Sequence, residues 1–181
     1  MATVVGVVCS AEGGVVLAGD RRQTKDGTVV SDSVQRVFDY DSAGYAVVGN
    51  PGSIEEFDRR FDAELRRYRT ERDEPMSSTR LARTASEIAT EAGVDALVAG
   101  RDEEGSVVLH EVGTDGRTVE TETAALGSGS PVAFGRLENG SMPDDLDAAE
   151  TLVRDTLRAV AERTTDTGGE IDVFRLEQTS E

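Results

Sequence analysis

Several polar side chains that could do chemistry stand at the ends of apolar runs or in glycine-rich turns. They are Thr3, Asp20, Arg21, Arg22, Thr24, Arg36, Ser128, Ser130, Thr164 and Thr167. The glycine-rich turn at 127–131 could offer main-chain N–H groups to an oxyanion, yet it lacks the lysine and the spacing of a nucleotide-binding loop. No histidine is available as a base for these serines and neither lies in a nucleophile elbow, so a serine-histidine-aspartate triad is excluded.

Histidine and cysteine, the residues that most often bind zinc, occur once each. His110 ends a strand-like run and has no second histidine or cysteine nearby, which argues against a metal site. Cys9 ends an apolar run, so we predict a buried, unreactive thiol, and a single cysteine cannot form a disulfide within the chain. We expect no metal and no cofactor.

The first half of the chain begins with strand patterns. Residues 1–9 are a β-branched apolar run without a basic leader, which predicts a buried strand and an amino end that a sheet holds in place. Residues 15–19 favour a second strand paired back on the first, and residues 36–40 and 45–49 favour a further pair. We therefore predict that the first fifty residues form one antiparallel sheet.

Helical periodicity follows. The apolar residues at helical spacing in the next segment are Ile54, Phe57, Phe61, Leu65 and Tyr68. A second helix is predicted from about residue 78 to Gly93, and a long third helix from Pro143. Strands at 96–100, 106–111 and 118–125 predict a second antiparallel sheet, and a last strand is expected at 171–176. The order predicts an α+β fold, a four-layer α-β-β-α sandwich of two face-to-face antiparallel sheets flanked by helices, as a single domain of residues 1–181.

The charge of the chain limits its partners. Nineteen basic against 36 acidic residues give a net charge of −17, which repels phosphate backbones and anionic lipid heads. We expect no nucleic acid and no membrane partner, and a cytoplasmic location. Lys25 is the only lysine, and such an acidic, lysine-poor composition resembles that of proteins from salt-loving microbes. An ordinary acidic cytosolic protein is the alternative.

Five blocks together carry a family resemblance. Residues 5–7, 15–22, 36–38, 127–131 and 168–173 resemble a β-type proteasome subunit of the N-terminal-nucleophile hydrolase superfamily, in order and from Ala2 to about Leu176. The lack of an extra helical segment before the first strand argues against the α-type subunits. The simpler bacterial relative matches the last two blocks less well.

The resemblance implies a threonine-type endopeptidase site. In that family the hydroxyl of an amino-terminal threonine attacks the substrate, and its own amine or a water takes the proton. Carried over by position, the acidic residue of the site matches Asp20 and the serine that supports the amine matches Ser128. The substrate-contacting threonine matches Thr24, and the glycine that offers an oxyanion amide matches Gly49.

Four positions depart from the family pattern. The nucleophile position falls on Ala2, which has no hydroxyl, and the lysine position falls on Arg36, which cannot lose its proton. The aspartate that pairs with the amine falls on Thr164, and the serine three residues later on Thr167. We therefore predict a non-catalytic subunit, because loss of one member of a coupled catalytic set removes most of the rate. Asp20 and Arg36 are expected to form a structural ion pair, and Ser128 and Ser130 to cap the following helix.

Two other functions stay open. Cleavage before Thr3 would make an active threonine peptidase, although alternation along a strand would turn that hydroxyl to the opposite face. The substrate cleft that the resemblance implies beside Thr24, Gly49 and Ser128 could instead bind a small molecule. For a non-catalytic chain the expected partners are copies of itself in a homo-oligomer or ring, or α-type and β-type proteasome subunits.

Overall fold

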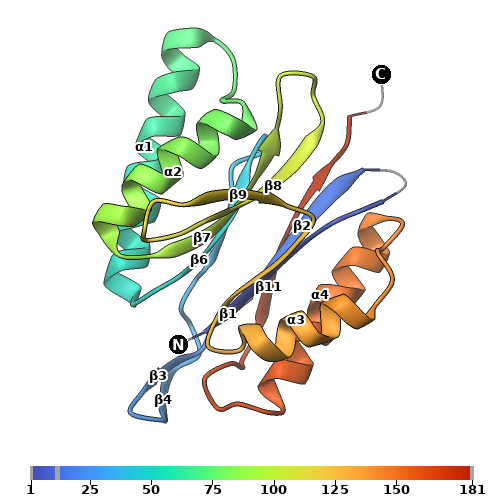
Figure 1. Cartoon of the computed structure of the whole chain (residues 1–181). Coiled ribbons are helices and arrows are strands. Elements are labelled where there is room, and N and C mark those ends of the chain that lie inside the picture. Colours follow the sequence, from blue (N-terminus) through green and yellow to red (C-terminus); the bar gives the residue numbers. More distant parts are fainter. Residues whose placement is uncertain (1, 11–12, 180–181) are drawn as a thin grey trace.

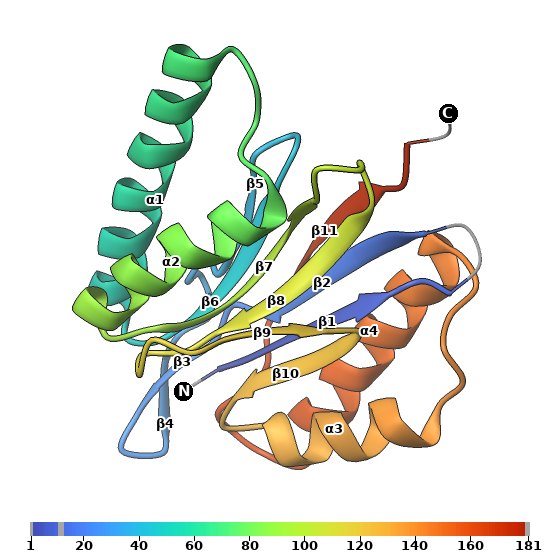
Figure 2. The ribbon, with the colours of Figure 1, turned by 45° about the horizontal axis from the view of Figure 1, so that its top comes forward.

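Two antiparallel sheets lie face to face between two layers of helices (Figures 1 and 2). The computed structural model describes residues 2–10 and 13–179. One sheet has the strand order β10-β1-β2-β11, at Thr123–Gly127, Thr3–Val8, Gly14–Asp20 and Ile171–Glu177. The other has the order β5-β6-β7-β8-β9, at Val37–Asp39, Gly44–Val48, Asp95–Arg101, Val107–Val112 and Thr118–Thr121. The predicted α+β sandwich is confirmed.

Helices cover the outer face of each sheet. The helices α1 at Pro51–Arg72 and α2 at Ser78–Ala92 pack on the five-stranded sheet through Ile54, Phe57, Phe61, Leu81 and Ile88. The helices α3 at Ser130–Asn139 and α4 at Leu146–Ala161 cover the four-stranded sheet. Asn50 caps α1 by accepting a hydrogen bond from the main-chain N–H of Ser53, and Gly93 ends α2 in the left-handed conformation.

Alternation along β1 assigns its side chains to two different layers. Val4 packs between the sheets, in one cluster with Leu17, Leu97 and Leu109, whereas Val5 packs against α3 and α4. Gly6 lies on the inter-sheet face, where an added Cβ would be 2.9 Å from Leu17 and 3.1 Å from Leu109. The glycine therefore lets the sheets approach closely at the start of the chain.

The division of strands between the sheets differs from the prediction. The first fifty residues do not form one sheet, because β1 and β2 belong to the four-stranded sheet and β5 and β6 to the five-stranded one. The run at 118–125 is not one strand either. It separates at Glu122 into β9 and β10, which pair in different sheets. In both runs, residues of good strand propensity stand on either side of the point where the chain passes from one sheet to the other. The local sequence pattern therefore could not reveal that point.

Two local details also differ. The last long helix begins at Leu146 rather than at Pro143, because the Asp145 side chain caps it and the main-chain oxygen of Pro143 accepts a hydrogen bond from Ser10. A short hairpin, β3 at Gln23–Lys25 and β4 at Thr28–Ser31, was not predicted and forms a separate two-stranded sheet. In the described ranges, no helix combines the length and the apolar character that crossing a bilayer requires.

The single histidine predicts a pH dependence of stability. His110 lies in β8, is 9% exposed, and its Nδ1 atom is buried without a hydrogen-bond partner. Burial lowers the pKa of His110, although the charge of Glu120 opposes this shift. As the pH falls, His110 is therefore protonated in the unfolded chain before it is protonated in the folded chain. The free energy of unfolding is highest above the unfolded pKa of about 6.5 and decreases as the pH falls below it.

The measurement compares wild type with His110→Leu. We expect the urea midpoint of wild type to fall more steeply between pH 7 and pH 5 than that of the variant. Both proteins carry the same carboxylates, so the difference between the two curves reports the replacement of His110. Parallel midpoints over this range would contradict the prediction.

Candidate functional site

The start of β1 holds the two residues on which the sequence-based site depends. Ala2 is 2% exposed, and its main-chain oxygen accepts a hydrogen bond of 3.1 Å from the main-chain N–H of Ser128. Gly127 makes this contact possible, since it has a φ of +100° and an added Cβ would be 1.8 Å from the oxygen of Ala2. The position that the resemblance assigns to the nucleophile is therefore a buried methyl group at a tightly packed main chain.

The hydroxyl of Thr3 lies on the other side of the sheet. Thr3 is fully buried, its Oγ1 is 2.8 Å from Oγ1 of Thr167, and it accepts a hydrogen bond of 3.1 Å from the main-chain N–H of Gly129. Thr3 shares the face of Val5, which packs on α3 and α4. Val4 faces the opposite way, toward Val37, the neighbour of Arg36 in the sequence. The Thr3 hydroxyl thus points away from the side of the sheet on which Arg36 lies.

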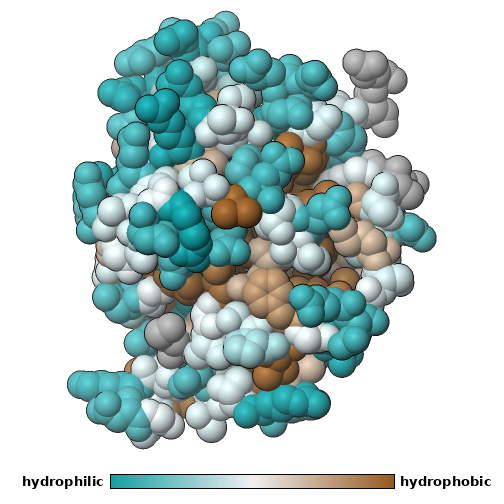
Figure 3. Space-filling model, viewed as in Figure 1, coloured by the Kyte–Doolittle hydropathy of each residue, from teal (hydrophilic) through white to brown (hydrophobic). Residues whose placement is uncertain are grey.

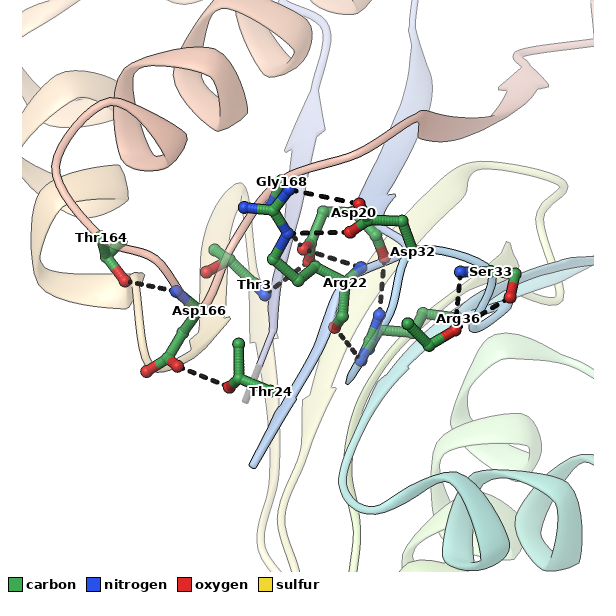
Figure 4. A network of polar contacts seen from close by, with 11 residues as sticks. Thr3, Asp20, Arg22, Thr24, Asp32, Ser33, Arg36, Thr164, Asp166 and Gly168 are labelled. Carbon is green, nitrogen blue, oxygen red and sulfur yellow. Dashed lines mark hydrogen bonds and ion pairs between the residues drawn. The ribbon is translucent and has the colours of Figure 1, made fainter. Parts of the chain in front are cut away.

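Asp20, at the end of β2, joins three segments of the chain (Figure 4). One carboxylate oxygen accepts a hydrogen bond of 2.9 Å from the N–H of Thr3. The other accepts from the N–H of Arg22 at 3.2 Å and from the N–H of Gly168 at 2.9 Å. Burial raises the pKa of Asp20, although these N–H groups and the charge of Arg36 favour the ionised form. The carboxylate is 1% exposed and serves as an acceptor for the main chain.

Arg36 fills the space beside Asp20 without binding its carboxylate. Its guanidinium donates hydrogen bonds of 2.9 Å to the main-chain oxygen of Asp20 and 2.7 Å to that of Arg22. Arg36 is 1% exposed, its Nε has no partner, and burial lowers its pKa. The predicted side-chain ion pair is therefore corrected. The Asp20 carboxylate already accepts hydrogen bonds from three main-chain N–H groups. The wide, planar guanidinium of Arg36 binds two main-chain carbonyl oxygens instead.

An ion pair between Arg22 and Asp32 lies over the last glycine-rich turn. Arg22 donates to the Asp32 carboxylate from Nε at 2.8 Å, and its guanidinium lies flat on Gly168, where an added Cβ would be 2.5 Å from Cζ. Gly169 has a φ of +77° and lies against Asp32. Arg22 was among the candidate residues predicted from the sequence, but Asp32 was not. The only signal for Asp32 was its place in a polar turn close to Arg22.

The loop before β11 brings another acidic residue to the site. The Thr24 hydroxyl donates a hydrogen bond of 2.6 Å to the Asp166 carboxylate, and the main-chain N–H of Asp166 donates to the Thr164 hydroxyl at 3.0 Å. Sequence reasoning passed over Asp166 because it falls between the two matched positions Thr164 and Thr167. A carboxylate thus lies two residues from the position where the resemblance expected one.

The other predicted site residues lie at the edges of this network. Gly49 follows β6 and packs on Val94, and none of the hydrogen bonds of Asp20 or Arg36 within the described ranges reaches it. Arg21 forms a pair of 2.8 Å hydrogen bonds with Asp172. The residue that caps α3 is Gly129, with no side-chain cap, so the prediction that Ser128 and Ser130 cap this helix is wrong. The N–H of Gly129 is instead directed at Thr3.

The buried groups of this network bind the main chain. The Asp20 carboxylate accepts from main-chain N–H groups, the Arg36 guanidinium donates to main-chain oxygens, and the Thr3 hydroxyl at the start of β1 is fully buried. Within residues 2–10 and 13–179, no group of three or more histidine, cysteine or acidic side chains is arranged to hold a metal ion. The network ties the starts of β1 and β3 to the loop before β11.

Known proteins match nearly the whole chain. The family model described as proteasome subunit matches residues 2–176. The proteasome subunit beta of Halomicrobium mukohataei is 34% identical over 177 residues, 94% of this chain and 73% of that protein. The protein of the same name from Halorhabdus utahensis is 35% identical, over 96% of this chain and 76% of its own length. Proteasome subunit beta 1 of Hyperthermus butylicus is 31% identical, over 99% of this chain and 91% of its own length.

Proposed function

Because the chain belongs to the proteasome subunit family, we propose that it is a β-type subunit without peptidase activity, which contributes structure to an assembly. The observation that carries the proposal is the start of β1. The residue at the nucleophile position, Ala2, has no hydroxyl, and the hydroxyl of the next residue, Thr3, is fully buried against Gly129 and Thr167. A nucleophile must reach its substrate, and neither residue offers one.

Arg36 supports the same proposal. A catalytic amine at this position would have to exchange a proton near neutral pH, and a guanidinium cannot do so. Arg36 also fills the interior, where it is 1% exposed and holds two main-chain oxygens. The buried Arg36 side chain also argues against a small-molecule site in the cleft beside Thr24, Gly49 and Ser128, since the charged groups at the base of that cleft are closed to solvent.

The role that remains is assembly. Members of this family assemble into rings with other proteasome subunits, and we propose that this chain occupies a β-type position in such a ring, as one domain of residues 1–181. The alternative assembly is a homo-oligomer that contains only copies of this chain. The acidic composition and the relatives from Halomicrobium and Halorhabdus support a protein adapted to high salt, and we propose a cytoplasmic location.

Intact mass spectrometry of the purified protein tests the proposal. After incubation with a threonine-reactive inhibitor, we expect a mass that begins at Met1 or Ala2 and carries no adduct. An active β-type subunit treated in parallel shows that the inhibitor is competent. A mass that begins at Thr3 and carries one inhibitor would instead establish an active threonine peptidase.

A further inference from the structure

A cavity of about 600 Å³ lies where the turn between β5 and β6 meets the end of α1. Its lining comes from residues 38–43, from Leu65 and Arg69 of α1, and from Met76 and Leu81. Figure 2 shows this turn beside the chain that connects α1 to α2. The volume is in the range of small-molecule pockets, and the cavity shares no lining residue with the network at the start of β1.

Aromatic rings form one wall of this cavity, and buried packing fixes their orientation. Phe38 and Tyr40 line it, and both stack on the Tyr45 ring, with centres 5.2 Å and 5.9 Å away. Tyr45 is 0% exposed and makes edge contacts with Phe57 and Phe61. Figure 3 shows mainly hydrophilic side chains over the two helices, at the upper left. The cavity thus offers a preformed flat surface for another ring beside a hydrophilic layer.

Three carboxylates line the same cavity, those of Asp39, Asp41 and Asp58. Asp58 accepts a hydrogen bond of 2.6 Å from the Tyr45 hydroxyl through Oδ1. Burial and this bond raise the pKa of Tyr45, so its hydroxyl stays a donor. Within the described ranges, Oδ2 of Asp58 makes no hydrogen bond or ion pair, and Asp39 accepts only from the N–H of Asp41, at 2.9 Å. Acceptor oxygens are therefore left for a ligand.

The positive charges at the cavity do not balance these carboxylates. Arg66 lines the cavity, but its guanidinium is already paired with Asp62, with Nε 2.6 Å from a carboxylate oxygen. Arg69 is exposed and, in the part of the chain that the structure describes, has no carboxylate at ion-pair distance. Residues 71–74, which follow it closely, contain three acidic residues and one arginine. The cavity and its edge therefore carry an excess of negative charge, which favours a cation over an anion.

The lining favours an organic cation over a metal ion. Within residues 2–10 and 13–179, no three acidic, histidine or cysteine side chains are arranged to hold a metal. An organic amine needs only one carboxylate, and the remainder of such a molecule can cover the apolar part of the wall. A positive charge is also attracted by the faces of aromatic rings such as those of Phe38 and Tyr40.

We propose that this cavity binds a small aromatic amine. The ring of the ligand lies against Phe38 and Tyr40, and its ammonium group pairs with the Asp58 carboxylate, with Asp39 and Asp41 adding to the attraction. This binding activity does not depend on the proposed role in assembly.

Tryptamine is a direct probe of this site because the chain contains no tryptophan. Its indole fluorescence anisotropy is followed as the intact protein is added, in a buffer in which circular dichroism shows the protein to be folded. We expect Asp58→Asn to weaken binding about tenfold, which corresponds to about 1.4 kcal/mol. The asparagine keeps an acceptor oxygen for the Tyr45 hydroxyl.

The control is Asp102→Asn, in the turn between β7 and β8. Asp102 also accepts hydrogen bonds from main-chain N–H groups, those of Glu104 and Ser106, but it does not line the cavity. This variant is expected to bind tryptamine like wild type. A matched anion, indole-3-propionate, has the same ring with a carboxylate in place of the amine. We expect wild type to bind it at least about tenfold more weakly than tryptamine.

A second variant keeps the test decisive if Asp58→Asn disturbs the fold. Asp39→Asn with Asp41→Asn removes two charges from an exposed turn, and asparagine adopts the left-handed conformation of Asp41, with its φ of +58°, as readily as aspartate does. We expect about threefold weaker binding, because exposed charges contribute less.

Four results would overturn the proposal. They are absence of tryptamine binding by wild type, equal affinity for indole-3-propionate, equal weakening in Asp102→Asn, and unchanged binding by both folded cavity variants.

Discussion

We expect Asp20→Ala to lower the free energy of unfolding by about 4 kcal/mol, because it leaves one buried and two part-buried N–H groups without their acceptor, at about 1–3 kcal/mol each. These donors are the main-chain N–H groups of Thr3, Arg22 and Gly168, and the side chain that they share is 1% exposed. Relief of the buried charge offsets part of the loss. The urea unfolding curve measures the change, which is a large share of the stability of a typical domain.

Two further variants separate the acceptor role from the charge. Asp20→Asn keeps one acceptor oxygen but turns an N–H₂ group toward an N–H donor, so we expect a loss of about 2 kcal/mol. Asp32→Ala removes a carboxylate from the exposed pair with Arg22 and is expected to cost less than about 1 kcal/mol. Equal stability of Asp20→Ala and Asp32→Ala would show that Asp20 does not hold these segments together.

We expect the double variant Ala2→Thr with Arg36→Lys to react with a threonine-reactive inhibitor on the order of a thousandfold faster than wild type, since it restores two members of a coupled set. Neither single variant is expected to react. Without the hydroxyl there is no nucleophile, and beside the Arg36 guanidinium the hydroxyl lacks the lysine amine that tunes the site in the family. Intact mass reports both the adduct and the residue at which the chain begins.

The variants Thr3→Ala and Asp20→Ala assign that reaction to its residues. In the background of the double variant, Thr3→Ala is expected to leave the labelling intact, because the Thr3 hydroxyl faces Thr167 on the other side of the sheet. Asp20→Ala is expected to abolish it. A double variant that melts like wild type, begins at residue 2 and stays unlabelled would show that the loss of activity extends beyond these two positions.

Much of the site could be predicted from the sequence because it depends on which atoms a side chain carries. Ala2 has no hydroxyl and Arg36 no exchangeable amine in any fold. Strand alternation also sufficed to predict that the Thr3 hydroxyl would face the opposite side of the sheet from the nucleophile position at Ala2, and Thr3 shares the face of Val5 rather than that of Val4. The helices α1 and α2 were predicted closely for a similar reason, since periodicity, an Asn50 cap and a Gly93 stop are local signals.

Contacts between distant segments required the tertiary structure. The sequence suggested that Asp20 would pair with the Arg36 side chain, but the carboxylate is taken by N–H groups up to 148 residues away. The contact of Asp166 with Thr24, which lies 142 residues earlier, could not be predicted from the sequence either. Whether such groups meet depends on strand register and on packing between layers, which short-range patterns do not encode.

The sequence by itself determined most of the helices and strands with their approximate bounds, though not the β3–β4 hairpin, and it also determined the family and the absence of a hydroxyl at residue 2. Only the tertiary structure decided that β1 and β5 belong to different sheets, that the run at 118–125 divides between them, and that Arg36 binds carbonyl oxygens. The physical reason is that propensity and periodicity act between neighbours in the chain. The sheet that a strand joins depends instead on the total packing of all layers.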